Sequence, residues 1–203
     1  MTLEVRLHAV LNQVFTTSDF CLTRGEVLPE LRIAYETYGT LNANRDNTVL
    51  LCHGYTSNHH MVGPPGATLA EGLWNSLVGP GKATTPINCL SFPVEHAPLG
   101  LSYGSTGPAQ ENPRTGRPYG PDFPEITLVD IVNAQRALLN HLGIDHLIAV
   151  VGPSYGGFQA FQWAVSFPDF VDGIVPVTSD FKASDDSTAN LNGLISRLES
   201  DPN

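Results

Sequence analysis

The stretch that decides the fold is Gly152-Pro153-Ser154-Tyr155-Gly156, a G-x-S-x-G sequence with a second glycine directly behind it. The apolar, β-branched run at residues 147–151 predicts a buried parallel strand. Residues 157–167 place their apolar side chains on one helical face and stop before a proline. A serine between a strand and a helix is typical of a nucleophile elbow, in which the hydroxyl is exposed above the sheet. The alternative is a chance match, which the flanking strand and helix patterns argue against.

Composition limits the classes of protein that this sequence can encode. The 203 residues suffice for one domain with a core, and the net charge of −10 argues against nucleic acid or an anionic membrane as the main partner. The three cysteines, Cys21, Cys52 and Cys89, lack C-x-x-C spacing, so they predict neither a disulfide framework nor a zinc site. We therefore expect a cytoplasmic protein. No run has the length of a membrane span, and the first ten residues do not resemble a signal peptide.

The order of predicted elements indicates an α/β fold. Apolar runs at residues 48–52, 88–92, 147–151 and 173–177 alternate with helical patterns, which predicts a mostly parallel sheet with helices on both faces. A capping-box sequence at Thr127–Asp130 predicts the start of one of these helices. Residues 14–22 and 31–38 predict two strands at the edge of the sheet, the second half-buried because its apolar residues alternate.

The loop after residues 48–52 is the place where hydrolases of this class supply part of an oxyanion hole. It begins His53-Gly54-Tyr55, and we expect the backbone amides of Tyr55 and Tyr155 to be the two donors. The nearby His59 and His60 lack metal-ligand spacing, so no metal is predicted. We interpret His53 as a strand-end histidine bonded to backbone, and the other two as loop residues.

Several blocks of sequence resemble the homoserine O-acetyltransferase family. They are Ala34–Asn42, Cys52-His53 with Thr56 and His59-His60, Gly79–Ala83, Tyr103–Pro108, Asn112-Pro113 and, most specifically, Thr115–Pro124. The resemblance implies an α/β-hydrolase fold and a ping-pong reaction in which acetyl-CoA, a cosubstrate rather than a bound cofactor, acetylates Ser154. We expect His53, Thr56, Gly104 and Arg117 to help form the pocket. Deacetylcephalosporin acetyltransferases also resemble this sequence.

The sequence departs from the family pattern in and around the elbow. Tyr155 replaces a usual methionine, Pro153 replaces a glycine, and Gly54-Tyr55 replaces Ala-Leu. No histidine follows Ser154, although the triad order of this fold is serine, acid, histidine. Asp180 is a candidate for a displaced acid, with a solvated loop carboxylate as the preferred interpretation.

The family likeness also predicts how the chain is organised. We expect residues 1–183 to form the N-terminal part of the hydrolase core and residues 184–203 to begin a helical lid. A further C-terminal segment would carry the acid and the histidine, so this chain alone is expected to be inactive. The expected partners are small molecules, an acyl-CoA and a hydroxyl acceptor, and a homodimer is possible. Candidates for a basic patch that holds coenzyme A are Lys82, Arg114 and Arg117.

Three functions compete at this point. The first is acyl transfer to an amino-acid hydroxyl or similar acceptor, and the second is ester hydrolysis with water as the acceptor. The third is an inactive binding module built on the same fold. Acetyl-CoA consumption with and without homoserine separates the first two, and labelling of Ser154 by a fluorophosphonate separates both from the third.

Overall fold

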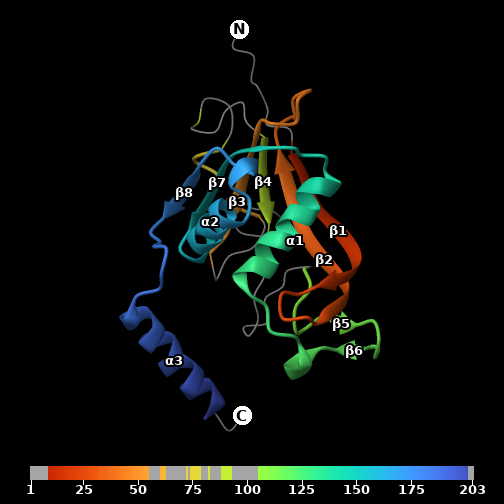
Figure 1. Ribbon diagram of the computed structural model, residues 1–203, viewed down its shortest axis with the longest axis vertical. Coiled ribbons are helices and arrows are strands. Elements are labelled where there is room, and N and C mark those ends of the chain that lie inside the picture. Colours follow the sequence, from red (N-terminus) through yellow and green to blue (C-terminus); the bar gives the residue numbers. More distant parts are fainter. Residues whose placement is uncertain are drawn as a thin grey trace.

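A six-stranded sheet forms the centre of the molecule (Figure 1). The computed structural model describes residues 9–54, 60–62, 72, 74–78, 82, 88–92 and 105–200. Strands β4, β3, β7 and β8 run parallel, and β1 and β2 are antiparallel to their neighbours. The mostly parallel sheet is therefore confirmed. In spatial order its strands are β1 (Ala9–Cys21), β2 (Val27–Tyr38), β4 (Asn88–Phe92), β3 (Thr48–Cys52), β7 (Leu147–Pro153) and β8 (Ile174–Val177).

Helices α1 (Leu128–His141) and α2 (Tyr155–Ser166) cover one face of the sheet, in front of it in Figure 1. Leu50 and Val150 point to this face and pack in one cluster with residues of both helices. The neighbouring Val49, Leu51 and Val151 point to the opposite face. Since both faces are covered, β3 and β7 are apolar without alternation. The opposite-face cluster is completed by Tyr38, Met61, Val62 and Val78.

The start of α1 confirms the predicted capping box. The hydroxyl of Thr127 accepts a hydrogen bond from the Asp130 amide, and the Asp130 carboxylate accepts one from the Thr127 amide at 2.9 Å. Asp130 also accepts a hydrogen bond from the Thr23 amide at 2.7 Å. One carboxylate therefore joins the helix terminus to the β1–β2 turn.

Strand β2 differs from its prediction in two respects. It begins at Val27 rather than Leu31, and it lies inside the sheet, between β1 and β4. Pro29 is tolerated in the strand because β4 pairs only with residues 36–38, so no hydrogen bond to β4 requires an amide at position 29. The prediction of a half-buried strand is wrong at Glu36 and Tyr38, which are buried because residues 60–62 cover that face.

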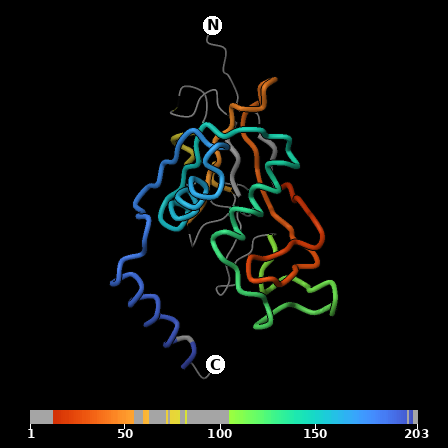
Figure 2. Tube along the Cα trace, in the orientation of Figure 1, coloured from red at the N-terminus to blue at the C-terminus, as the bar shows by residue number. Residues whose placement is uncertain are grey.

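Beyond β8 the chain forms helix α3 (Asp185–Glu199), drawn at the lower left in Figures 1 and 2. Its described side chains are all exposed, including Leu191, Leu194 and Ile195. The helix at these residues is confirmed, and its role in a lid stays a prediction. In the part of the chain that the structure describes, no helix combines the length and the apolar character needed to cross a membrane.

Residues 105–122 form a compact excursion at the lower right of Figure 1. It contains the short hairpin of β5 (Glu111–Asn112) and β6 (Arg117–Pro118), followed by the 3-10 turn η1 (Gly120–Asp122). Ser105 and Thr106 accept hydrogen bonds from the amides of Ala34 and Arg32, so this excursion begins against β2. A second 3-10 turn, η2 (Pro168–Phe170), connects α2 to β8.

Candidate active site

Ser154 occupies the sharp turn between β7 and α2, as the sequence predicts. Its backbone angles are φ 52° and ψ −117°, a conformation that is unfavourable for a residue with a Cβ. Two hydrogen bonds of 2.9 Å hold the turn: the Ser154 amide donates to the carbonyl of Val177, and the Gly157 amide donates to the carbonyl of Ser154. The residue is exposed, and its hydroxyl does not cap the helix. This is the geometry of a nucleophile elbow.

The glycines of the elbow are required by close contacts between backbone segments. A Cβ on Gly152 would lie 2.4 Å from the carbonyl carbon and oxygen of Gly156. A Cβ on Gly156 would lie 2.2 Å from the carbonyl oxygen of Cys52, at the end of β3. The missing side chains therefore let the elbow pack directly against β3.

The elbow lies at the edge of the sheet where the parallel strands have their carboxyl ends. In open α/β sheets this edge is the usual place for ligands. Tyr155 is the first residue of α2, so its amide belongs to the helix N-terminus, which favours developing negative charge. Its assignment as an oxyanion donor remains a prediction, and its predicted partner Tyr55 lies outside the described residues.

His53 follows β3 and lies beside the elbow. Its side chain is only 3% exposed, and Nδ1 lies 2.6 Å from the carbonyl oxygen of Gly54. Its own carbonyl accepts a hydrogen bond of 3.4 Å from Gln159 of α2. The interpretation of a strand-end histidine bonded to backbone is confirmed, and the ring is packed inside the protein.

The remaining predicted pocket residues are not gathered around Ser154 by any contact between described residues. Thr56 and Gly104 lie outside the described part of the chain. Arg117 is exposed on the β5–β6 hairpin, with its amide 3.4 Å from the hydroxyl of Thr115. Asp180 is exposed and accepts a hydrogen bond from the amide of Phe181 at 2.7 Å, as a solvated loop carboxylate does.

A histidine–carboxylate pair is present, but at the wrong end of the sheet. Nε2 of His146 lies 2.8 Å from Oδ1 of Asp172. His146 immediately precedes β7, whereas Ser154 follows its last residue, and seven residues of strand span about 20 Å. This pair therefore cannot serve Ser154 as a general base.

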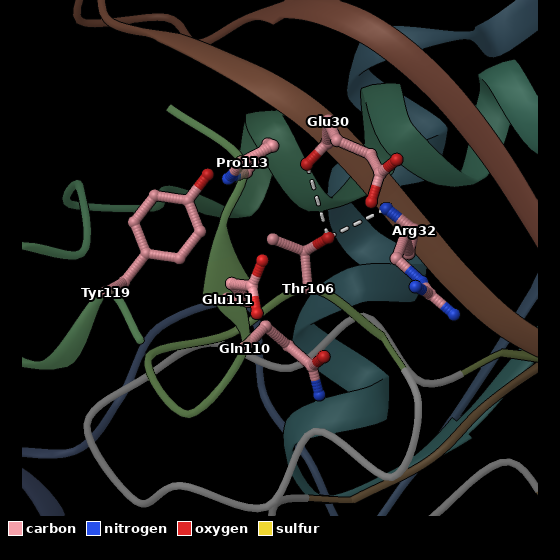
Figure 3. Close-up of a pocket in the computed structure, with 7 residues that line it drawn as sticks. All are labelled: Glu30, Arg32, Thr106, Gln110, Glu111, Pro113 and Tyr119. Atoms are coloured by element: carbon pink, nitrogen blue, oxygen red, sulfur yellow. Dashed lines mark hydrogen bonds between the residues drawn. The ribbon is translucent and has the colours of Figure 1, made fainter. Parts of the chain in front are cut away.

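A cavity of about 250 Å³ opens between β2 and the residue 105–122 excursion (Figure 3). Its walls carry two carboxylates, from Glu30 and Glu111, and the phenol of Tyr119. Burial raises the pKa of Tyr119, the positive charge of Arg114 opposes this, and the Glu30 carboxylate adds to it. Arg117 does not line the cavity. The full lining is Glu30, Arg32, Thr106, Gln110, Glu111, Pro113 and Tyr119.

A buried network of neutral side chains, not evident in the sequence, joins both helices to β3. The side-chain amide of Gln135 donates to Gln159 at 2.7 Å, and the indole of Trp163 donates to Gln135 at 2.7 Å. Gln159 in turn contacts the carbonyl of His53. Burial raises the pKa of the adjacent Cys52 thiol far above its ordinary value, so this cysteine is a neutral core residue. Only the spacing of the two glutamines on apolar helix faces could have indicated their burial.

A second buried network, also missed, contains ionisable side chains on the opposite face of the sheet. The carboxylate of Glu36 contacts the hydroxyl of Tyr38 and lies 3.0 Å from Nδ1 of His60. His60 is a loop residue, as interpreted, but it is only 9% exposed and its ring contacts Glu36 of β2, which the sequence did not indicate. Loop position alone does not show that a histidine is packed under a strand.

Residues 47–199 match the family model described as the alpha/beta hydrolase fold. The match covers most of the chain and contains the elbow strand, the serine and the helix behind it. The chain belongs to the alpha/beta hydrolase fold family. The sheet order and the turn at Ser154 agree with this assignment.

More specific relatives confirm the resemblance to homoserine acyltransferases. The chain is 43% identical over 202 residues to a homoserine O-acetyltransferase of Haloarcula marismortui, covering 96% of this chain and 48% of that protein. It is 46% identical over 159 residues to a homoserine O-succinyltransferase of Methylibium petroleiphilum, covering 78% of this chain and 41% of that protein. Among solved structures, esterase E22 matches with a TM-score of 0.86 and 34% identity, covering 98% of this chain and 54% of that one. The chain thus spans about half the length of the proteins it matches.

Proposed function

We propose that the full-length protein is a serine-nucleophile acyltransferase, and that Ser154 carries the acyl group. The observation that carries this proposal is the exposed serine held at φ 52° between β7 and α2, beside a helix N-terminus. The similarity to homoserine O-acetyltransferase and homoserine O-succinyltransferase sequences supports acyl transfer as the reaction class.

The proposed reaction has two steps. The hydroxyl oxygen of Ser154 attacks the thioester carbonyl of acetyl-CoA and gives its proton to a base; the carbon–sulfur bond then breaks and the thiolate leaves with a proton. The acceptor hydroxyl, which we propose to be that of homoserine or a similar amino acid, gives its proton to the base and attacks the carbonyl of the acyl-serine; the bond between Ser154 Oγ and the acyl carbon breaks, and Oγ regains a proton. In both steps negative charge develops on the carbonyl oxygen, which the amides of Tyr155 and Tyr55 would stabilise.

The base must come from another residue, because a serine hydroxyl is a weak nucleophile without one. No histidine follows Ser154 in this chain, and the matched relatives are about twice as long. We therefore propose that the acid and the histidine are supplied by residues beyond Asn203. Helix α3, with its exposed Leu191 and Leu194, would begin the lid over the carboxyl edge of the sheet.

The acyl group transferred in the proposed reaction is acetyl or succinyl. Relatives of similar identity carry the names of acetyl and succinyl transferases. Arg114 and Arg117 are both exposed on the β5–β6 excursion and offer positive charge for the phosphates of a coenzyme A donor. Competition between acetyl-CoA and succinyl-CoA in one assay measures the preference directly.

The proposal is tested by trapping the intermediate in the full-length protein. Incubation with acetyl-CoA and no acceptor should release one thiol per active site and acetylate the peptide that contains Ser154. Added homoserine should restore turnover, and Ser154→Ala should abolish both the burst and the adduct. An unmodified Ser154 peptide together with full activity of the alanine variant would rule out the assigned nucleophile.

Ester hydrolysis is the second candidate, favoured by the structural match to esterase E22. Both functions use the same acyl-serine and differ in whether water or an alcohol attacks it. A hydrolase would consume acetyl-CoA or p-nitrophenyl acetate at a rate that homoserine does not change. A transferase would show a rate that rises with homoserine, with O-acetylhomoserine as the product.

A further inference from the structure

The cavity between β2 and the residue 105–122 excursion is formed by walls that are bonded to each other. The Thr106 amide donates to the carbonyl of Arg32 at 2.9 Å, and the Arg32 amide donates to the Thr106 hydroxyl at 2.7 Å (Figure 3). Within the excursion, the Tyr119 amide donates to the carbonyl of Gln110 at 3.0 Å. The cavity is therefore held open by contacts that a ligand does not have to create.

Tyr119 contributes a buried hydroxyl to the cavity wall. The residue is only 6% exposed, and its ring packs edge-on against Phe123 with the centroids 5.3 Å apart, so its orientation is fixed. Figure 3 shows the hydroxyl turned toward Pro113, which also lines the cavity. Among the described residues, no group forms a hydrogen bond with this buried oxygen. Because an unpaired buried hydroxyl is unfavourable, a ligand in the cavity would gain affinity by pairing with it.

The carboxylates of the lining give the cavity a negative charge. Glu30 and Glu111 both line it, and neither forms an ion pair with any residue that the structure describes. The Glu30 carboxylate is close enough to act on the Tyr119 hydroxyl electrostatically. Arg32 supplies one positive charge, but Figure 3 shows its side chain extending away from Tyr119. One negative charge of the lining therefore remains uncompensated.

The size and the chemistry of the cavity limit what it can bind. A cavity of about 150 Å³ is enough to bind benzene, so this one, of about 250 Å³, has room for a small organic molecule. Two carboxylates disfavour an anion. A metal ion is disfavoured as well, since the described residues contain no cluster of three or more His, Cys, Asp or Glu side chains that could hold one. An ammonium group carries one positive charge and donates three hydrogen bonds, which suits two carboxylates and a phenol oxygen.

The cavity lies at the same edge of the sheet as Ser154, but away from it. One row of paired residues crosses the sheet from β2 to β7, formed by Glu36, Ser91, Leu51 and Val151. Ser154 lies three residues beyond this row, and Glu30 lies six residues beyond it in the same direction, because β2 is antiparallel to β4. The strand spacings between β2 and β7 add up to about 14 Å. A small molecule in the cavity therefore does not reach Ser154.

We propose that this cavity binds a small organic molecule through a primary ammonium group, which the carboxylates of Glu30 and Glu111 hold with the Tyr119 hydroxyl as a further partner. The proposal does not depend on the function assigned to Ser154. Simple amines and amino acids both carry such a group. The carboxylate of an amino acid would in addition meet the positive charge of Arg32 on the same lining.

Three probes of matched shape test the ligand chemistry. Norleucine carries both charged groups, pentylamine lacks its carboxylate, hexanoate lacks its ammonium, and none has a hydroxyl that could accept an acyl group. In titration calorimetry with the full-length protein, we expect pentylamine and norleucine to bind with millimolar or lower dissociation constants. Tighter binding of norleucine would identify an amino acid as the ligand, and equal or weaker binding a simple amine. Hexanoate binding as tightly as pentylamine, or no binding of either ammonium compound, would overturn the proposal.

Glu30→Gln and Glu111→Gln locate the ammonium group. Each removes one charge from the lining and should weaken pentylamine binding by about tenfold. Glu111 is exposed, so E111Q is expected to fold normally. Glu26→Gln is the matched control, because Glu26 is an exposed carboxylate of the β1–β2 turn that does not line the cavity. Equal affinity in E30Q, E111Q and E26Q would place the amine elsewhere and contradict the proposal.

Tyr119→Phe distinguishes a binding role from a structural one. The hydroxyl has no partner among the described residues, so its loss should leave the unfolding temperature without ligand equal to that of wild type or higher. The affinity for pentylamine should nevertheless fall by about tenfold. A structural role would give the opposite result, a lower unfolding temperature with unchanged affinity of the folded protein.

Ser154→Ala shows whether the ligand binds away from the nucleophile. We expect pentylamine and norleucine to bind this variant as tightly as wild type, whatever its turnover. Unchanged binding with retained turnover would remove the nucleophile assignment and leave the ammonium site in place. Loss of binding in S154A would place the amine at the elbow and overturn the proposed site.

Discussion

Two polar networks are buried on opposite faces of the same sheet, and they differ in chemistry. On the face covered by α1 and α2, the network of Gln135, Gln159 and Trp163 contains neutral groups joined by bonds of 2.7 Å. On the other face, Glu36, Tyr38 and His60 are all ionisable. Each network ends on a backbone carbonyl beside segment 55–59, that of His53 in the first and that of Val62 in the second.

The two networks are expected to contribute differently, one to the stability of the fold and the other to catalysis. Neutral amides satisfy one another and hold helices to a strand without electrostatic cost, so we expect the first network to act on stability. Buried ionisable groups destabilise a fold unless they are fully paired, so a role in function is the better explanation for such a network. We therefore expect the second network to affect turnover. The variants below test this division, from the largest expected effect to the smallest.

The largest effect is expected where the elbow touches β3. In Gly156→Ala the new Cβ would lie 2.2 Å from the Cys52 carbonyl, and backbone on both sides prevents relief. We expect a loss of more than about 3 kcal/mol in the free energy of unfolding, measured by urea denaturation. Gly173→Ala is the control, since no atom lies within 4 Å of its Cβ. Similar stability of the two variants would show that the elbow and β3 are not packed as described.

The neutral network is tested by replacing one amide with an apolar side chain of similar length. Gln135→Met leaves the Trp163 indole and the Gln159 oxygen without their buried partner, which should cost about 3 kcal/mol of unfolding free energy. Per folded molecule, kcat should stay within about threefold of wild type. Gln162→Met on the half-buried side of α2 is the matched control and should change stability by less than about 0.5 kcal/mol. A large fall in kcat for Q135M would contradict the proposal that the neutral network affects stability and not turnover.

Replacement of Asp130 tests whether a buried charged group can contribute to the stability of the fold without affecting kcat. Burial alone would raise the pKa of its carboxyl, but hydrogen bonds from Thr127 and Thr23 outweigh this and lower it. Because the folded-state pKa is lowered, the stabilisation is complete above about pH 4 and is lost as the pH falls through the lowered value. We expect Asp130→Asn to cost about 2 kcal/mol at pH 7, with the difference from wild type shrinking below pH 4 and kcat unaffected. Thermal melts across this pH range check the trend, and a constant difference would contradict it.

The smallest effect is expected outside both networks, on α3. Gly193 lies inside this helix, with no atom within 4 Å of a new Cβ. Gly193→Ala should stabilise the helix locally by about 0.5–1 kcal/mol. Slower amide hydrogen exchange in residues 185–199, with unchanged kcat, is the expected result. Faster exchange there would mean that α3 packs through its glycine.

The elements predicted most accurately are those specified by local patterns. Strand β3 was predicted residue for residue because an uninterrupted apolar run fits a strand covered on both faces. The start of α1 followed from Thr127 and Asp130, whose spacing alone satisfies the free helix amides. The elbow followed from glycines and a serine at fixed spacing.

The missed features depend on what covers a strand, which local sequence does not encode. The alternation of β2 shows that Glu36 and Tyr38 share a face, but not that residues 60–62 lie on it. The predicted strand began at residue 31, beyond Pro29, because a proline rarely fits a paired strand; in the structure β4 pairs only with residues 36–38 and stops short of Pro29. The proposed pocket residues Thr56 and Gly104 remain predictions, because both lie outside the described part of the chain.

The hydrogen bond between the Ser154 amide and Val177 has a consequence for the order of assembly. The strained serine conformation requires its acceptor, so the elbow can take its final shape only once β8 has paired alongside β7. In the full-length protein, labelling of Ser154 by a fluorophosphonate during refolding should therefore not begin before β8 has joined the sheet.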